Sequence, residues 1–126
     1  MTDSPALPAV RKFIKEINSG TVSLVLLSTL SQSDKPLYGY EIANRLEDGG
    51  KEALPVKRGT LYPVLRSMEE QGLLGSHVEP SVSGPPRKYY FITDEGRETL
   101  VEWKKVWRRT LDFVTDALKE DVNRND

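Results

Sequence analysis

The chain contains no cysteine, and this absence removes several classes of protein at once. Disulfide frameworks, zinc fingers and thiol nucleophiles all depend on a residue that the sequence lacks. It has a single histidine, His77, so an enzyme would have to work with Asp, Glu, Lys and Tyr alone. No Ser/His/Asp set, glycine-rich phosphate loop or carboxylate pair with catalytic spacing is present. We therefore expect a protein that is not an enzyme and holds no metal or cofactor, with His77 as a surface residue.

Long hydrophobic runs are missing as well. The longest, from Val22 to Leu27 with Ser23 inside it, is far shorter than the ~20 residues that span a bilayer. Near the N-terminus the apolar side chains are interleaved with charged ones, unlike the apolar centre of a signal peptide. Together with the absence of cysteine, these features predict a cytoplasmic protein.

A strong charge of either sign is also lacking. The formal net charge is -1, whereas many nucleic-acid-binding domains are strongly basic. The distribution matters more than the total, because salt screens charges beyond about 8–10 Å. The middle of the chain is mildly basic, with Lys51, Lys57, Arg58, Arg66, Arg87 and Lys88 against Glu52, Glu69, Glu70 and Glu79. This bias permits DNA binding without arguing for it.

What the sequence does contain is a clear series of amphipathic segments. Apolar residues recur at helical spacing over residues 10–17, 21–30, 38–46 and 60–71, and Ser19-Gly20 is expected to separate the first two helices. Residues 54–56 are expected to be extended, and residues 73–79 and 87–93 to form two strands of a hairpin. Thr93 is typical of a helix N-cap, and the helix that follows it is expected to reach about Lys119.

This order predicts a mainly α fold with a small β wing. It is a winged helix-turn-helix with an N-terminal helix before it and a long C-terminal dimerisation helix after it. We divide the chain into an N-terminal helix that braces a dimer (1–19), a DNA-binding winged helix-turn-helix domain (20–92), a C-terminal dimerisation helix (93–120) and a flexible tail (121–126).

Residues 60–71 have the two faces that a recognition helix needs. The inner face carries Leu61, Val64, Leu65 and Met68, and the outer face begins with Arg58, Thr60, Tyr62, Pro63 and Arg66. Arginine and short polar side chains at the start of a helix can reach base edges in the major groove. Pro63 suits the first turn, where amides have no intrahelical partner. An ordinary surface helix has the same pattern, and we expect Glu69 and Glu70 to form a solvated face.

The hairpin carries cations directly after its tip. Gly84-Pro85-Pro86 is stiff and is followed by Arg87 and Lys88, which could reach a backbone phosphate or the minor groove. Tyr89 and Phe91 alternate with Lys88 and Tyr90, so one strand face is expected to pack inward while the other stays polar. A plain hairpin with solvated charges fits these residues nearly as well.

Three motifs in order resemble the PadR family of bacterial transcription regulators. They are Tyr38-Gly39-Tyr40-Glu41-Ile42, then Gly59-Thr60-Leu61-Tyr62-Pro63-Val64-Leu65 with Glu69 and Gly72, then Pro86-Arg87-Lys88-Tyr89-Tyr90 with Thr93-Asp94-Glu95-Gly96. The resemblance implies a dimeric repressor of a partly palindromic operator, released by a small aromatic or cationic effector. It also implies that the residues at or near DNA are Lys57, Arg58, Thr60, Tyr62, Pro63, Arg66, Arg87 and Lys88. At the wing, Pro85 stands where the family often has an arginine, so one phosphate contact per wing is expected to be absent.

The last helix carries an apolar seam close to a heptad repeat. Its members are Leu100, Trp103, Trp107, Leu111, Val114 and Leu118. A second copy of the chain would cover this seam, giving a homodimer with two recognition helices. The alternative is that the seam folds back on its own domain. The single helix resembles the short-tailed PadR subfamily, whose matching tryptophan stacks on flat aromatic ligands. Trp103 and Trp107 are therefore either an effector site or plain dimer core.

The sequence thus predicts a ligand-responsive repressor that binds double-stranded DNA as a homodimer. The alternative is a winged-helix protein-interaction module that does not bind DNA. Cations gathered on one surface would favour DNA, whereas an exposed apolar patch there would favour a protein partner.

Overall fold

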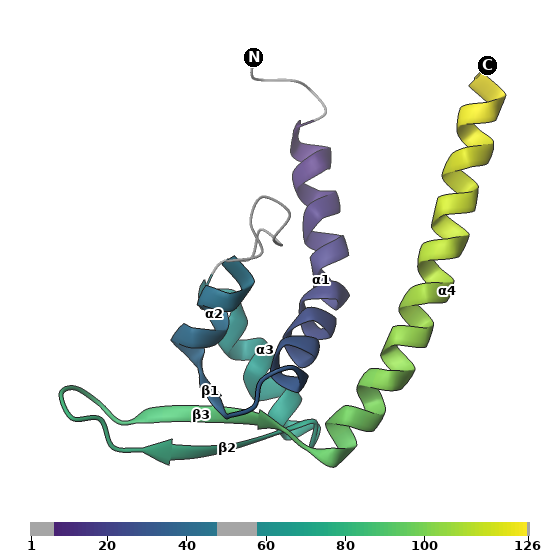
Figure 1. The fold of residues 1–126 in the computed structure, drawn as a ribbon. Coiled ribbons are helices and arrows are strands. Elements are labelled where there is room, and N and C mark those ends of the chain that lie inside the picture. Colours follow the sequence, from purple (N-terminus) through teal and green to yellow (C-terminus); the bar gives the residue numbers. More distant parts are fainter. Residues whose placement is uncertain (1–6, 48–57, 126) are drawn as a thin grey trace.

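The computed structural model describes residues 7–47 and 58–125, with backbone alone at residue 58 and at residues 120–125. The elements are α1 (Leu7–Ser31), β1 (Leu37–Tyr38), α2 (Gly39–Glu47), α3 (Arg58–Glu70), β2 (Leu74–Glu79), β3 (Arg87–Ile92) and α4 (Asp94–Asn125). In Figure 1, α2, α3 and the second half of α1 lie on one side of the sheet, and α1 and α4 extend away from it as two arms. The mainly helical fold with a small β wing is therefore the one expected.

The core lies where the second half of α1 meets α2, α3 and the inner face of the sheet. Leu26 and Leu27 of α1, Ile42 of α2 and Leu65 of α3 are fully buried. They are joined by Val22, Leu30, Leu37, Ala43, Leu61, Met68, Leu73, Leu74, Tyr90, Ile92 and Leu100. Each helix contributes one apolar stripe at spacings of three and four residues, which is why the periodicity identified these helices. None of the described helices is long and apolar enough to cross a membrane.

The sheet has three antiparallel strands in the order β1-β3-β2. Tyr90 and Ile92 of β3 face the core, whereas Phe91 is 39% exposed on the outer face. The face of β3 that carries Tyr90 and Ile92 is therefore the one turned to the core, with Lys88 at its exposed end, although Tyr89 and Phe91 are the more apolar pair. Phe91 lies opposite Gly75 in the register, and its ring fills the space that a Cβ on Gly75 would need. A glycine partner thus lets the exposed ring lie flat on the sheet.

The predicted break at Ser19-Gly20 is wrong, because α1 is one continuous helix of 25 residues. A glycine inside a helix costs only about 1 kcal/mol, and burial of Val22 and Leu26 in the next two turns holds the helix in place. The hydroxyl of Thr21 also donates to the carbonyl of Ile17 across the expected break, at 2.9 Å.

Three other boundaries differ from the sequence prediction. Residues 37 and 38 form β1, which was not predicted, and α2 begins after them; the side chain of Glu41 accepts from the amide of Tyr38, as in half of a capping box. Because α3 begins at Arg58, Pro63 lies in the second turn and leaves the Gly59 carbonyl without its helical donor. Helix α4 continues to Asn125, so residues 121–125, predicted as a flexible tail, are helical. The extended piece predicted at 54–56 lies outside the described residues.

Candidate nucleic-acid interface

The outer face of α3 is free of the core along its length. Leu61, Leu65 and Met68 are buried on the inner face, with Val64 partly buried beside them. Thr60, Tyr62, Pro63 and Arg66 are exposed on the other side. Of the remaining predicted contacts, Lys57 lies outside the described residues and Arg58 is the first residue of α3, its side chain not being described. The helix therefore has the two faces that its sequence predicts.

A pocket of about 340 Å³ lies between α3 and the wing formed by β2 and β3. Its lining comes from β1, from the start of α2, from α3 and from β3: Tyr38, Gly39, Tyr40, Tyr62, Arg66, Arg87, Lys88 and Tyr90. Two arginines that are distant in sequence, Arg66 and Arg87, thus lie on the same hollow with three tyrosines that are at least partly exposed. Guanidinium and phenol groups are suited to phosphate oxygens, which accept hydrogen bonds but donate none.

Gly39 fixes the place of Tyr62. A Cβ on this glycine would collide with the ring of Tyr62, so the ring lies directly against the backbone at the start of α2. The sequence marked Gly39 only as part of a motif; the structure gives the reason for a glycine at that position. Tyr62 is still 43% exposed and lines the pocket.

Arg87 is held above an aromatic row on the outer face of the sheet. Its Cζ lies 4.6 Å from the ring centroid of Tyr38, a cation–π contact. Tyr38 in turn stacks on Tyr40 at 6.3 Å and meets Tyr89 edge-on at 5.4 Å. A guanidinium that lies on a ring keeps its N–H donors for another partner. The contact with Tyr38 therefore orients the side chain of Arg87 and leaves its N–H groups available to a further partner.

Lys88 forms an ion pair within the chain. Its Nζ lies 3.0 Å from Oε1 of Glu69 on α3, while the hydroxyl of Ser76 on β2 donates to Oε2 of the same carboxylate at 2.5 Å. The hydrogen bond from Ser76 and the contact with Lys88 lower the pKa of Glu69, and Glu69 raises the pKa of Lys88. Glu69 was expected on a solvated face together with Glu70. It is instead partnered, and no local sequence pattern indicates this because both partners lie on later elements.

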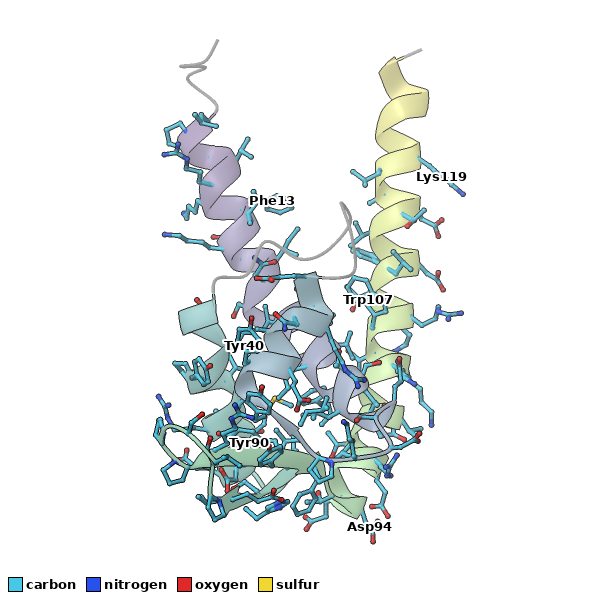
Figure 2. The ribbon with its side chains drawn as sticks, turned by 60° about the vertical axis from the view of Figure 1, so that its left-hand side comes forward. Phe13, Tyr40, Tyr90, Asp94, Trp107 and Lys119 are labelled. Atoms are coloured by element: carbon cyan, nitrogen blue, oxygen red, sulfur yellow. The ribbon has the colours of Figure 1, made fainter. Side chains whose placement is uncertain are left out.

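A second hollow lies between the two arms, α1 and α4. It measures about 680 Å³ and is lined by apolar and polar residues of both helices, among them Glu16, Trp103 and Trp107, and by Gln71 from the turn after α3. Figure 2 shows Phe13 on α1 and Trp107 on α4 pointing into the space between these helices. The hollow contains both tryptophans that the sequence offers as either an effector site or plain dimer core.

The predicted seam of α4 divides into two parts. Leu100 is 4% exposed and belongs to the core of its own domain, and Trp103 is half-buried against that core. Beyond them Trp107, Leu111, Val114 and Leu118 are between 41% and 61% exposed. On α1, Val10, Phe13, Ile14 and Ile17 are exposed as well. Both arms thus leave apolar stripes uncovered in the single chain.

Comparison with known proteins gives a consistent result. The family model "Transcriptional regulator PadR-like family" matches residues 26–102. The crystal structure of a PadR family transcriptional regulator from Eggerthella lenta is 38% identical, covers 88% of this chain and 93% of its own, and superposes with a TM-score of 0.75. A PadR-like transcriptional regulator from Bacillus cereus is 34% identical over 82% of this chain and 96% of its own, with a TM-score of 0.66. An uncharacterized protein from Lysinibacillus sphaericus is 27% identical over 99 residues, which are 79% of this chain and 89% of that protein.

Proposed function

The chain belongs to the PadR-like family of transcriptional regulators, and on that premise we propose that it is a ligand-responsive repressor that binds a pseudo-palindromic DNA operator as a homodimer. The observation that carries DNA binding is the pocket between α3 and the wing, where Arg66 and Arg87 meet three tyrosines. A recognition helix and a wing that present cations to the same hollow can bind one duplex together, each at a different groove.

The two arginines have different tasks in this proposal. Arg66 is exposed on α3, and its side chain makes no hydrogen bond or ion pair with any described residue, so its guanidinium can reach a guanine edge or a phosphate. Arg87 lies on the wing strand with its ring contact to Tyr38, and it would bind backbone phosphate beside the groove. Thr60, Tyr62 and Pro63 complete the exposed surface of α3 that would enter the major groove.

The distribution of exposed apolar residues favours DNA over a protein partner at this face. Among the residues that the structure describes, and apart from tyrosines, three exposed large apolar side chains lie outside the two arms, and they belong to the wing: Val78, Val82 and Phe91. The long apolar stripes are on α1 and α4 instead. These stripes support the homodimer, because a second copy of the chain is a partner whose matching stripes would cover both.

The hollow between α1 and α4 supports a ligand-responsive dimer. Trp103 and Trp107 offer aromatic faces, and the carboxylate of Glu16 on the opposite helix, which is exposed and lies 3.9 Å from the ammonium of Lys12, would attract a cation. A flat aromatic cation bound between the arms would favour one spacing of the two lobes over another. DNA binding would be lost when the recognition helices no longer match major grooves one turn apart, about 34 Å. Since these are the only tryptophans of the chain, quenching of intrinsic fluorescence by a planar aromatic dye tests this part directly.

The experiment that tests the function is binding to the DNA upstream of the protein's own gene, measured by gel shift at two salt concentrations. We expect the wild type to bind tightly and to weaken with salt, since phosphate contacts release counterions. The Arg66→Ala and Arg87→Ala variants should each weaken binding by about 1–3 kcal/mol if they contact bases or phosphates.

The matched control is Arg97→Ala, which removes an exposed cation from the first turns of α4, at the end of the sheet away from the wing tip (Figure 1). It should bind as the wild type does. Wild-type protein that ignores this DNA and also selects no sequence from a random duplex library would contradict the proposal and favour the protein-interaction module.

A further inference from the structure

One carboxylate joins the recognition helix to both strands of the wing. Glu69 is in the last turn of α3, and its two oxygens take different partners: Ser76 of β2 at 2.5 Å and Lys88 of β3 at 3.0 Å. The side chain of Glu69 is 31% exposed, and the ammonium of Lys88 also lies 5.3 Å from the ring of Tyr90. The carboxylate therefore has a hydrogen bond to one strand and an ion pair to the other.

Lys88 lines the same pocket as the two arginines proposed to bind DNA. Arg66 precedes Glu69 by three residues on α3, so the two side chains emerge on the same side of the helix, one turn apart. Arg87 is the neighbour of Lys88 on β3, and successive side chains of a strand point to opposite faces. The link from Glu69 to Lys88 therefore joins the helix that carries Arg66 to the strand that carries Arg87.

We propose that Glu69 is a positioning residue for DNA binding, which holds the wing through Ser76 and Lys88 at the angle where Arg66 and Arg87 meet one duplex. Lys88 serves this clamp in place of a phosphate contact. The inference rests on the proposed DNA-binding function, and it assigns Lys88 a role different from the one that its motif implies.

Removal of the Glu69 charge changes operator affinity in opposite directions, depending on whether Lys88 contacts a phosphate or belongs to the clamp. If Lys88 were a phosphate contact, Glu69→Gln would free its ammonium and remove a negative charge near DNA, so every duplex would be bound more tightly and with a steeper salt dependence. If Glu69 is a clamp, the same variant loosens the wing. Operator affinity then falls, while affinity for unrelated DNA stays level or rises.

The test uses the full chain and an operator selected by the wild type, with an unrelated duplex of equal length beside it. Binding of each is followed by fluorescence anisotropy over a range of salt concentrations. We expect Glu69→Gln to lose about 5- to 20-fold in operator affinity, which lies within the range of a coupled contact, and to lose specificity by at least as much. Glu70→Gln is the matched control: it makes the same charge change on the next residue, whose exposed side chain contacts no described residue through a hydrogen bond or ion pair.

A charge exchange and a measurement without DNA complete the design. The double variant Glu69→Lys with Lys88→Glu should recover part of the specificity, because the ion pair re-forms with its direction reversed. In the free protein, amide hydrogen exchange of β2 and β3 should be faster in Glu69→Gln than in the wild type and in Glu70→Gln.

Two results would overturn the clamp: operator affinity of Glu69→Gln equal to or above that of Glu70→Gln, or equal hydrogen exchange in all three proteins. A wild type that selects no sequence would instead overturn the proposed function, and hydrogen exchange would still decide whether Glu69 restrains the wing.

Discussion

The hydroxyl of Thr93 links the start of α4 to the turn that follows α3. It lies 2.7 Å from the carbonyl oxygen of Gly72 and 3.1 Å from that of Leu73, to which it can donate. It also accepts from the amide of Gly96 at 3.0 Å, the geometry of a helix N-cap. The predicted N-cap is confirmed, and its second task, on the turn at Gly72, was not visible in the sequence.

We expect Thr93→Val to lower the free energy of unfolding by about 1–2 kcal/mol, because the shape is kept while the capping oxygen is lost. Thr93→Ser, which keeps the hydroxyl, should stay much closer to the wild type. Urea unfolding at one fixed protein concentration measures both, since dimerisation would add to apparent stability. A valine variant as stable as the serine variant would show that the methyl group, and not the hydrogen bonds, matters at this position.

The contact between Glu69 and Lys88 also predicts how stability depends on pH. The folded-state pKa of Glu69 is lowered below its ordinary 4.5, so its stabilising effect is complete above that value and is lost as pH falls through the lowered pKa. The folded-state pKa of Lys88 is raised above 10.5, so its effect is complete below that value and is lost as pH rises through the raised pKa.

The stability difference between wild type and Glu69→Gln should therefore be largest between these limits and should shrink as the pH falls below 4.5 and through the lowered pKa of Glu69. Urea unfolding of both proteins at a series of pH values gives this difference directly. A difference that is constant with pH would mean that the charge of Glu69 does not stabilise the fold.

Single residues also show where prediction from sequence stops. The inner and outer faces of α3 could be predicted from spacing alone. In a helix of 3.6 residues per turn, the neighbours Leu65 and Arg66 point in different directions, whatever the tertiary structure. The ion-pair partner of Lys88 could not be predicted from spacing, because the contact with Glu69 depends on how β3 packs against α3. Motif resemblance assigned the lysine to DNA, and only tertiary geometry reveals its competing partner.

Among the elements, α1 and the sheet differ most from expectation. Ser19-Gly20 carries a local stop signal, yet hydrogen bonding continues through it, since no proline follows and the next turn is anchored in the core. Strand β1 has two residues and exists only because Leu37 and Tyr38 pair with β3, a contact that no local period indicates. Burial of Tyr90 over Phe91 is likewise decided by which strand face meets α1 and α3.

The continuity of α1 makes Gly20 a site where stability can be gained. A Cβ at this position meets no atom within 4 Å in the described chain. We expect Gly20→Ala to raise the free energy of unfolding by about 0.5–1 kcal/mol, because alanine loses less conformational entropy in a helix. Thermal and urea unfolding at a fixed concentration test this. A loss of stability would contradict the prediction and would place a neighbouring surface against Gly20.

At the scale of the whole molecule, one lobe holds the core and two arms extend from it (Figure 1). The lobe is complete within one chain, because its helices and sheet bury one another. The arms are not: beyond Trp103 the described side chains of α4 are exposed, and so are nearly all those in the first half of α1. Apolar stripes of this length are ordinarily covered, and a second copy, with its own two arms, supplies matching stripes.

The exposed apolar stripe of α4 predicts that two copies of the chain associate through this helix. Val114 is 44% exposed on α4 between Leu111 and Leu118, so a glutamate there would bring a carboxylate into the proposed helix pair and oppose association. Light scattering after size-exclusion chromatography should give the mass of two chains for the wild type and of one chain for Val114→Glu at micromolar concentration. Arg109→Gln, which makes the same unit change of charge on the opposite face of α4, should stay dimeric.

The monomeric Val114→Glu variant should keep the circular dichroism of the wild type, since its core lies in the lobe, and should bind half an operator as weakly as unrelated DNA. A wild type with the mass of one chain would contradict the dimer, and two separate lobes would then have to bind DNA without the spacing that paired arms impose.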